Sequence, residues 1–377
     1  MQLTDLETPA LLLDRTRLDR NLARMREHLT QLRVALRPHV KTAKSIDVVR
    51  RAFAEQPEGI TVSTLKEAEH FFSHGVTDIL YAVAIAPNKL DHVAELRAQG
   101  ADISVILDSV AAADALADRG EALATEFPAL IEIDCDGHRS GVKPGDATLV
   151  DIGARLHGRR GARLKGVMTH AGDSYNCRSV DAIRMMAERE RTAVVRCAED
   201  LARAGLPCPV VSVGSTPTAT YAQRMDGVTE VRAGVYMFFD LVMAGIDVCT
   251  LDDIALSVLT SVIGHQPERN RILTDAGWMA LSRDRGTAKQ PVDQGYGVVC
   301  DLAGRPIDDL IVIDTSQEHG IITDRNGRHV DCSRFPLGTL LRILPNHACA
   351  MAAQHAHYHV IAGEPRVEAV WPRFSGW

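Results

Sequence analysis

The sequence lacks several features that would assign the chain to a special class of protein. No apolar run approaches the about 18–20 residues that a helix needs to cross a bilayer. The opening segment Met1-Gln-Leu-Thr-Asp5 is polar and acidic, unlike a secretory signal. The 42 basic and 49 acidic residues give a net charge of −7, which argues against a nucleic-acid-binding surface. We therefore expect a globular protein with neither a membrane nor a nucleic acid as partner.

The eight cysteines form no C-x-x-C pair and are dispersed along the 377 residues. In a chain of this length such a pattern is typical of free thiols in a reducing compartment, so we expect a cytoplasmic enzyme. The composition, with 46% hydrophobic and 24% charged residues, is sufficient for a full core in one large domain or two ordinary ones.

Short apolar runs alternate with amphipathic helical segments from about residue 30 to 235. The runs are nearly continuous and rich in β-branched residues, as in a parallel sheet that is covered on both faces. Eight such units in roughly 200 residues match a closed (β/α)8 TIM barrel. An open doubly wound sheet is the alternative, but no G-x-G-x-x-G follows the first strand. The predicted barrel strands cover residues 34–40, 60–63, 78–82, 103–108, 129–134, 164–171, 210–214 and 228–233.

The helical period disappears after about residue 253, and a mostly antiparallel β domain is predicted there. Its strands, separated by Gly, Asp, Asn and Pro turns, are expected at 254–264, 271–275, 297–301, 310–315, 339–344 and 357–362. The run 9–14 also has the pattern of a strand and should pair with this domain. We therefore assign 15–253 to the barrel, and 1–14 with 254–377 to the β domain.

The active site of such a barrel gathers at the carboxyl ends of its strands. Lys41 follows the first strand; alone, it would be interpreted as a solvated rim residue. Burial at the end of an apolar strand would favour the neutral amine that a Schiff base needs. Small residues, hydroxyls and backbone N–H groups follow strands seven and eight, where barrels hold phosphate. They are Gly214, Ser215, Thr216, Gly234, Val235 and Tyr236.

A lysine opposite a phosphate cradle is the combination that pyridoxal phosphate requires, although Gly-Ser-Thr turns are common. Longer motifs are more specific: Arg37-Pro-His-Val-Lys-Thr-Ala-Lys44, Asp136-Gly-His-Arg-Ser-Gly-Val142, Asp275-Ala-Gly-Trp-Met279, Gln317-Glu-His-Gly320 and Pro345-Asn-His-Ala-Cys349. They resemble the fold-type III pyridoxal-phosphate enzymes, the alanine racemase-like group, and within it the D-threonine aldolase and D-serine dehydratase branch. The resemblance covers nearly the whole chain.

The resemblance implies a role for each matching residue of the barrel. Lys41 would bond the cofactor and remove the substrate's α-proton, while His170 would pack against the pyridine ring. Arg139 would lie near the phenolic oxygen. Arg232 would face the pyridine nitrogen and keep it unprotonated, because a guanidinium can only donate. For Arg139 the alternative is a structural ion pair with Asp134 or Asp136.

His347 and Cys349 form an H-x-C pair whose simplest interpretation is a core histidine and a buried thiol. In a strand, residues i and i+2 face the same side, so both could bind one ion. The resemblance implies that they hold one divalent metal ion in the β domain. Imidazole and thiolate suit zinc or another late transition metal, and Mn, Co, Ni and Mg stay open. Glu318 and His319 could orient these ligands or form a structural pair.

The resemblance further implies a carbon–oxygen lyase that dehydrates a D-3-hydroxy amino acid to a 2-oxo acid and ammonia. 3-Hydroxyaspartate would give oxaloacetate and D-serine would give pyruvate, with the metal assisting departure of the β-hydroxyl. The alternatives are an aldolase, a racemase with Tyr296 as second base, and a non-catalytic cofactor carrier, against which the long β domain argues. Candidates for binding the substrate are Arg283, Arg285, Lys44 and Tyr175, although the loop around Arg283 could simply be solvated. Family analogy also implies a homodimer with a shared active site.

Overall fold

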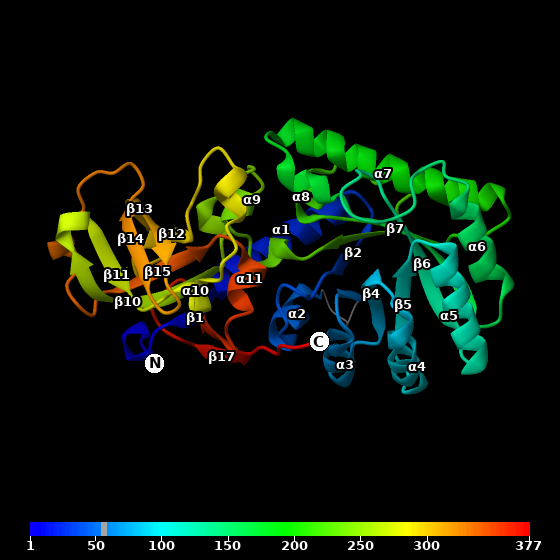
Figure 1. Cartoon of the computed structure of the whole chain (residues 1–377), viewed down its shortest axis with the longest axis horizontal. Helices are drawn as coiled ribbons and strands as arrows, with labels where there is room; N and C mark the ends of the chain where they lie inside the picture. Colours follow the sequence, from blue (N-terminus) through cyan, green and yellow to red (C-terminus); the bar gives the residue numbers. More distant parts are fainter. Residues whose placement is uncertain (54–58) are drawn as a thin grey trace. The chain divides into compact units, whose positions relative to one another are not determined.

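A computed structural model of the chain (Figure 1) describes residues 1–53 and 59–377. These residues form two compact units. The barrel unit comprises residues 24–234 and 376–377, and the β unit comprises residues 1–23 and 235–375. Among the described residues, every helix is too short or too polar to span a bilayer.

Eight parallel strands in the order β2-β9-β8-β7-β6-β5-β4-β3 form the barrel unit. A parallel bridge between His39 and Thr61 joins the two edge strands, and the Val40 N–H donates to the Thr61 carbonyl at 2.9 Å. The predicted (β/α)8 barrel is confirmed, and each strand overlaps its predicted range. The strands are β2 (Ala35–Pro38), β3 (Ile60–Val62), β4 (Asp78–Ala84), β5 (Asp102–Leu107), β6 (Phe127–Ile133), β7 (Ala162–Thr169), β8 (Val210–Val213) and β9 (Glu230–Ala233).

Helices follow the strands and cover their outer side in Figure 1. Several begin at the N-cap that their sequence provides: Thr64, Ser109 and Ser179 each accept the backbone N–H three residues later. The apolar strand side chains between these layers are buried, which explains why the strands appear in the sequence as continuous apolar runs. The helices are α1 (Arg15–Gln31), α2 (Ile46–Ala52), α3 (Leu65–Ser73), α4 (Leu90–Ala98), α5 (Val110–Ala122), α6 (Thr148–Gly158), α7 (Val180–Arg203) and α8 (Thr216–Tyr221).

The β unit is built on one sheet in the order β11-β14-β13-β12-β15-β10-β1-β16-β17, and β10 also pairs with β11. The second pairing of β10 closes the six strands from β10 to β15 into a ring. All pairs are antiparallel except β1 with β16. The strands are β1 (Ala10–Asp14), β10 (Leu256–Gln266), β11 (Arg271–Thr274), β12 (Gly297–Cys300), β13 (Pro306–Thr315), β14 (Gly320–Asp324), β15 (Leu340–Pro345), β16 (His357–Ile361) and β17 (Ala369–Pro372).

The β unit matches the predicted antiparallel domain, and it contains elements that the sequence analysis missed. Strand β14 and strand β17 were not predicted. Three short helices were also missed, namely α9 (Leu241–Ala244), α10 (Trp278–Leu281) and α11 (Ala348–Ala352). Four or five residues are too few to display a helical period, so a pattern of hydrophobic positions does not detect them.

Candidate active site

Lys41 lies in the turn that follows β2, three residues beyond the last residue of the strand. Its side chain is exposed, so the burial that would favour a neutral amine is not observed. The reason is that β2 ends at Pro38, which places Lys41 beyond the apolar strand rather than inside it. The charge of Lys41 acts on His39, His170 and Glu67, and the amine therefore belongs to the polar group at the carboxyl ends of the strands.

His170 follows β7 and is the residue around which the predicted cofactor residues gather. Burial lowers the pKa of its imidazole to about 3, although a hydrogen bond to the Gly214 carbonyl opposes the shift. Nearby Arg139, Lys41 and Arg232 lower that pKa further. A carbonyl can only accept, so Nδ1, 2.8 Å from the Gly214 oxygen, carries the hydrogen of a neutral ring.

Arg232 on β9 is buried and donates in two directions. Nη1 lies 2.5 Å from Ser212 Oγ and Nη2 lies 2.5 Å from the Thr169 carbonyl oxygen. The Ser212 hydroxyl in turn donates to Glu230 Oε1 at 2.7 Å, and Glu230 Oε2 accepts from Arg37 Nε at 2.7 Å. This chain of bonds inside the barrel fixes the orientation of the Arg232 guanidinium, which can only donate.

Arg139 lies in the turn after β6, where its Nη2 is 3.5 Å from Oε1 of the buried Glu132. The alternative in which Arg139 pairs with Asp134 or Asp136 is wrong. Those carboxylates accept backbone N–H groups instead: Asp134 binds those of Asp136 and Gly137, and Asp136 binds those of His138 and Asp173. The aspartates therefore shape the turn that carries Arg139.

The predicted phosphate cradle shows strong packing constraints. A Cβ on Gly214 would lie 1.9 Å from the Arg232 carbonyl oxygen, so the approach of β9 alone requires glycine there. The Ser215 hydroxyl caps α8 and lies 2.9 Å from both Ser174 Oγ and Thr218 Oγ1. Gly234 is constrained less strongly, since a Cβ there would lie 2.9 Å from the His39 carbonyl oxygen. Phosphate binding by this segment therefore stays a prediction.

The remaining barrel candidates lie in different surroundings. The Tyr175 ring is 6.4 Å from the His170 ring, centroid to centroid. Lys44 Nζ is 3.4 Å from Glu67 Oε1, so this amine is paired with a carboxylate. Val235 and Tyr236 are buried in the short helix Val235–Met237 and belong to the β unit.

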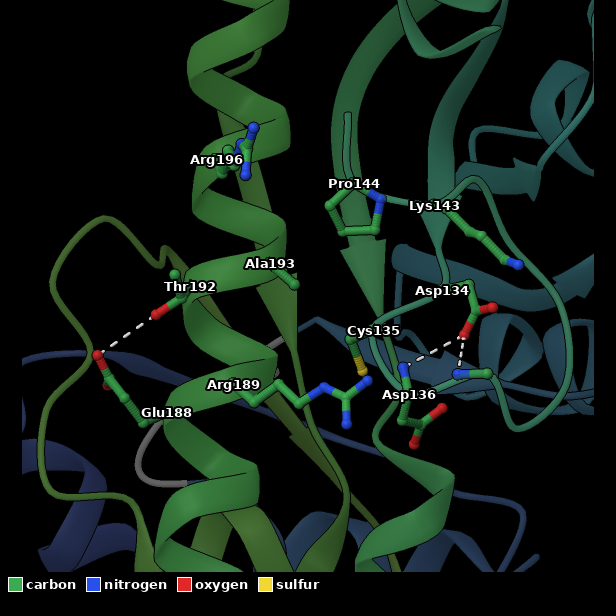
Figure 2. Close-up of a pocket in the computed structure, with 11 residues that line it drawn as sticks. Asp134, Cys135, Asp136, Lys143, Pro144, Glu188, Arg189, Thr192, Ala193 and Arg196 are labelled. Carbon is green, nitrogen blue, oxygen red and sulfur yellow. Dashed lines mark hydrogen bonds between the residues drawn. The ribbon is translucent and has the colours of Figure 1, made fainter. Parts of the chain in front are cut away.

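A cavity of about 610 Å³ lies between the turn after β6 and helix α7 (Figure 2). Its lining includes Asp134, Cys135 and Arg189, and none of the predicted site residues is part of that lining. Burial raises the pKa of the Cys135 thiol to about 12, which keeps the sulfur protonated. The cavity is thus separate from the group around His170.

His347 and Cys349 lie at the start of a helix, not in a strand. His347 is the N-cap of α11 and Cys349 belongs to the first turn, so the argument from alternation along a strand is wrong. The two side chains nevertheless share a hydrogen bond. His347 Nδ1 lies 2.6 Å from Asp284 Oδ2, which leaves Nε2 for another partner. Burial opposes protonation, but the bonds to Asp284 and Cys349 raise the pKa of His347.

Two carboxylates that the sequence analysis did not single out position this histidine. Asp284, which lies between Arg283 and Arg285, contacts the imidazole directly. The buried Asp240 accepts the backbone N–H of Ala348 at 3.0 Å and so anchors the start of α11. Glu318 and His319 are both exposed, so a buried structural pair is wrong, and the side chain in contact with His347 Nδ1 is that of Asp284. Among residues 1–53 and 59–377, no three His, Cys, Asp or Glu side chains form a metal-binding group.

The two predicted substrate arginines differ in their partners. The Arg283 guanidinium stacks over the Trp278 ring at 4.3 Å, and within the described residues it has no carboxylate partner. Arg285 is paired with Asp293 at 2.5 Å and lies over the Tyr296 ring at 5.3 Å. Arg283 is therefore the better of the two candidates for an anionic group of a ligand.

Comparison with known proteins identifies the family. Residues 13–242 match the family model "Alanine racemase, N-terminal domain", and residues 255–361 match "Putative serine dehydratase domain". The chain is 54% identical to D-threo-3-hydroxyaspartate dehydratase of Delftia sp. HT23, over 100% of this chain and 99% of that protein. It is 31% identical to D-serine dehydratase of Dictyostelium discoideum, over 97% of this chain and 96% of that protein.

Solved structures agree with this assignment. The Delftia dehydratase matches with a TM-score of 0.97 over all of both chains, and one of its variants, with cysteine replaced by alanine, is described as a metal-free form. Alanine racemase of Clostridium difficile 630, 13% identical, has a TM-score of 0.69 over 97% of this chain and 98% of its own, which shows the fold alone. The chain belongs to the alanine racemase-like family of fold-type III pyridoxal-phosphate enzymes, in the group whose barrel is followed by a serine dehydratase domain.

Proposed function

We propose that this chain dehydrates D-threo-3-hydroxyaspartate to oxaloacetate and ammonia. The observation that carries the proposal is the identity of 54%, over the whole chain, to an enzyme named for that substrate. The site agrees with it, because the charges of Lys41, Arg139 and Arg232 all lower the pKa of His170 at the strand ends of the barrel. The net reaction removes the α-hydrogen and the β-hydroxyl as water, and water then displaces nitrogen as ammonia.

The residues around His170 fit pyridoxal phosphate, because the charges of Arg139, Lys41 and Arg232 all act on an uncharged ring at a site that would receive a phosphate and a phenolate. When bound, this cofactor withdraws electrons from the substrate's α-carbon and eases loss of the α-proton. Lys41 would bond the cofactor and then, as a free amine, take that proton. The His170 ring would pack against the pyridine, Arg139 would lie near its phenolic oxygen and Arg232 would donate to its nitrogen. The phosphate would be held by Gly214, Ser215, Thr216, Gly234, Val235 and Tyr236.

His347 and Cys349 fit a divalent metal, which would supply a Lewis acid for departure of the β-hydroxyl. The contact of Nδ1 with Asp284 supports this role, because a carboxylate on one ring nitrogen orients the other toward a metal. Two protein ligands would leave open positions for substrate and water, as in catalytic metal sites. A solved relative, a cysteine-to-alanine variant of D-threo-3-hydroxyaspartate dehydratase, is named as the metal-free form, which implies that this relative also has a metal-bound form.

The substrate carries a second carboxylate, for which Arg283 is the candidate partner. Its side chain is exposed and its Cζ lies 4.3 Å from the centroid of the Trp278 ring, and no carboxylate of the described residues occupies its N–H groups. Arg285 is less suited because Asp293 already binds it. Tyr175, beside His170, would contact the substrate near the cofactor. We expect the enzyme to act as a homodimer in the cytoplasm.

Product analysis with D-threo-3-hydroxyaspartate tests the reaction. Equal amounts of ammonia and oxaloacetate, absent with the Lys41→Ala variant, are the expected result. Glycine and glyoxylate would instead identify an aldolase. Pyruvate from D-serine, with no turnover of 3-hydroxyaspartate, would agree with a dehydratase and contradict the proposed substrate.

A further inference from the structure

Helix α7 presents a stripe of buried residues to the barrel, and one of them is a glutamate. The stripe consists of Ile183, Ala187, Glu190, Val194, Cys197 and Leu201. The spacing of three and four residues is that of a helix face packed on strands. Glu190 is 1% exposed, and a carboxylate in such a position must be hydrogen-bonded to be tolerated.

The bonds of Glu190 lead to the ends of two strands. Its Oε1 accepts the Ala171 N–H at 2.9 Å and the Gly214 N–H at 3.0 Å. The ladder between β7 and β8 ends earlier, at Met168 with Ser212. Glu190 therefore joins the segments after β7 and β8 beyond the point where the two strands pair with each other.

The same two segments are joined again by His170. Its Nδ1 donates to the carbonyl of Gly214, the residue whose N–H Glu190 accepts. The backbone N–H that Glu190 holds on the other segment belongs to Ala171, the residue after His170. Ser174 extends the network, since its hydroxyl donates to the Ala171 carbonyl at 2.7 Å and lies 2.9 Å from Ser215 Oγ.

We propose that Glu190 is a positioning residue that fixes the plane and the neutral Nδ1–H form of His170 together with the 214–216 turn, and thereby sets the affinity for pyridoxal phosphate. This inference rests on the proposed function, in which both elements contact the cofactor. Glu190 acts from behind them and touches neither cofactor nor substrate. Burial raises the pKa of Glu190, while its bonds to Thr218, Ala171 and Gly214 oppose that shift.

The proposed role of Glu190 requires an oxygen that accepts hydrogen bonds, not a negative charge. Two substitutions of Glu190 should therefore have different effects. Glu190→Gln keeps an oxygen that can accept both N–H groups. Glu190→Met keeps the length of the side chain and removes the acceptor. Glu188 is the control: it lies two residues away on the exposed side of α7, where it accepts from the Thr192 hydroxyl (Figure 2) and from Arg191.

The test uses full-length protein with ¹⁵N-labelled histidine, freed of cofactor and titrated with pyridoxal phosphate. We expect Glu190→Met to weaken binding by at least about tenfold and to give His170 nitrogen shifts that report a mixture of tautomers. Glu190→Gln and Glu188→Met should both stay close to the parent in affinity and in the His170 signals. A folded Glu190→Met protein with unchanged affinity and an unchanged His170 tautomer would overturn the proposal.

Amide hydrogen exchange of the unsubstituted protein decides the matter if Glu190→Met does not fold. The Ala171 and Gly214 amides should exchange as slowly as strand amides, although both lie beyond the strand ends. Fast exchange of either amide would contradict the proposal that Glu190 holds these two backbone N–H groups. Neither the histidine signals nor the amide exchange requires turnover. A chain that makes no oxaloacetate would therefore contradict the proposed function, whereas the role of Glu190 would still be decided by these two measurements.

Discussion

The ion pair between Arg37 and Glu230 inside the barrel permits a stability prediction that can be compared with a matched surface pair. Glu230 Oε2 accepts from Arg37 Nε at 2.7 Å, and both side chains are nearly buried, with 13% and 11% exposed. Burial opposes ionisation of Arg37, but Glu230 and Asp78 raise the pKa of its guanidinium. The pair of Arg163 Nε with Glu126 Oε1, at 2.6 Å, has 46% and 47% exposed side chains.

Glu230→Gln leaves one oxygen for two donors. The carboxylate receives Arg37 on one oxygen and the Ser212 hydroxyl on the other, so the new amide can keep its oxygen toward Arg37 only by turning its N–H group toward Ser212, whose hydroxyl must then accept instead of donate. Removing one partner of a buried ion pair costs about 3–5 kcal/mol, and the retained oxygen should keep the loss near about 3 kcal/mol. Glu126→Gln should cost less than about 1 kcal/mol because its pair is solvated.

Urea unfolding followed by far-UV circular dichroism measures both losses. The expected result is a lower midpoint for Glu230→Gln at an unchanged slope, and a midpoint for Glu126→Gln close to that of the parent. Equal shifts for the two variants would refute the reasoning, because burial would then not be the property that separates two ion pairs of nearly equal length.

Three further predictions concern the site itself. Lys41→Ala should remove the visible absorbance of bound cofactor and lower product formation more than about 10³-fold; turnover near that of the parent would exclude Lys41 as the base. The pKa of His170 is about 3 in the folded chain against an ordinary 6.5, so the unfolded chain binds the extra proton and stability falls as the pH drops below 6.5. From pH 7 to pH 5 the parent should lose about 2 kcal/mol more than His170→Asn, and parallel losses would contradict the burial of a neutral ring. Asp284→Asn should weaken divalent metal binding by about 10–100-fold in a chelator competition, whereas Asp293→Asn in the same loop should not; equal affinities would exclude orientation of His347 by Asp284.

The architecture was predictable because its signals are local. Most barrel strands are nearly continuous apolar runs, and the turns between strands of the β unit are marked by Gly, Asp, Asn and Pro. The closing bridge between His39 and Thr61 has no local signal, yet closure follows once eight units are counted. The roles of Lys41, His170 and Arg232 came from motif resemblance and stay predictions, although the structure gathers these residues.

The contacts that hold the site in place were not predictable from local patterns. Asp284 meets His347 across 63 positions of sequence, and within a charged run nothing distinguishes it from a solvated residue. The H-x-C pair was misplaced because the five-residue helix α11 is too short to show a period. Glu190 did leave a trace, since it falls on the stripe of Ile183, Ala187 and Val194, where a helix of this pattern buries apolar residues.

Ammonia release from D-threo-3-hydroxyaspartate, measured on one preparation before EDTA, after EDTA and after a divalent ion is returned, tests the central claim most directly. A dehydratase that uses His347 and Cys349 to hold its metal should lose ammonia release with EDTA and regain it with the ion, at constant cofactor absorbance. Ammonia release that is unaffected by EDTA in a preparation shown to be free of metal would contradict metal-assisted departure of the hydroxyl.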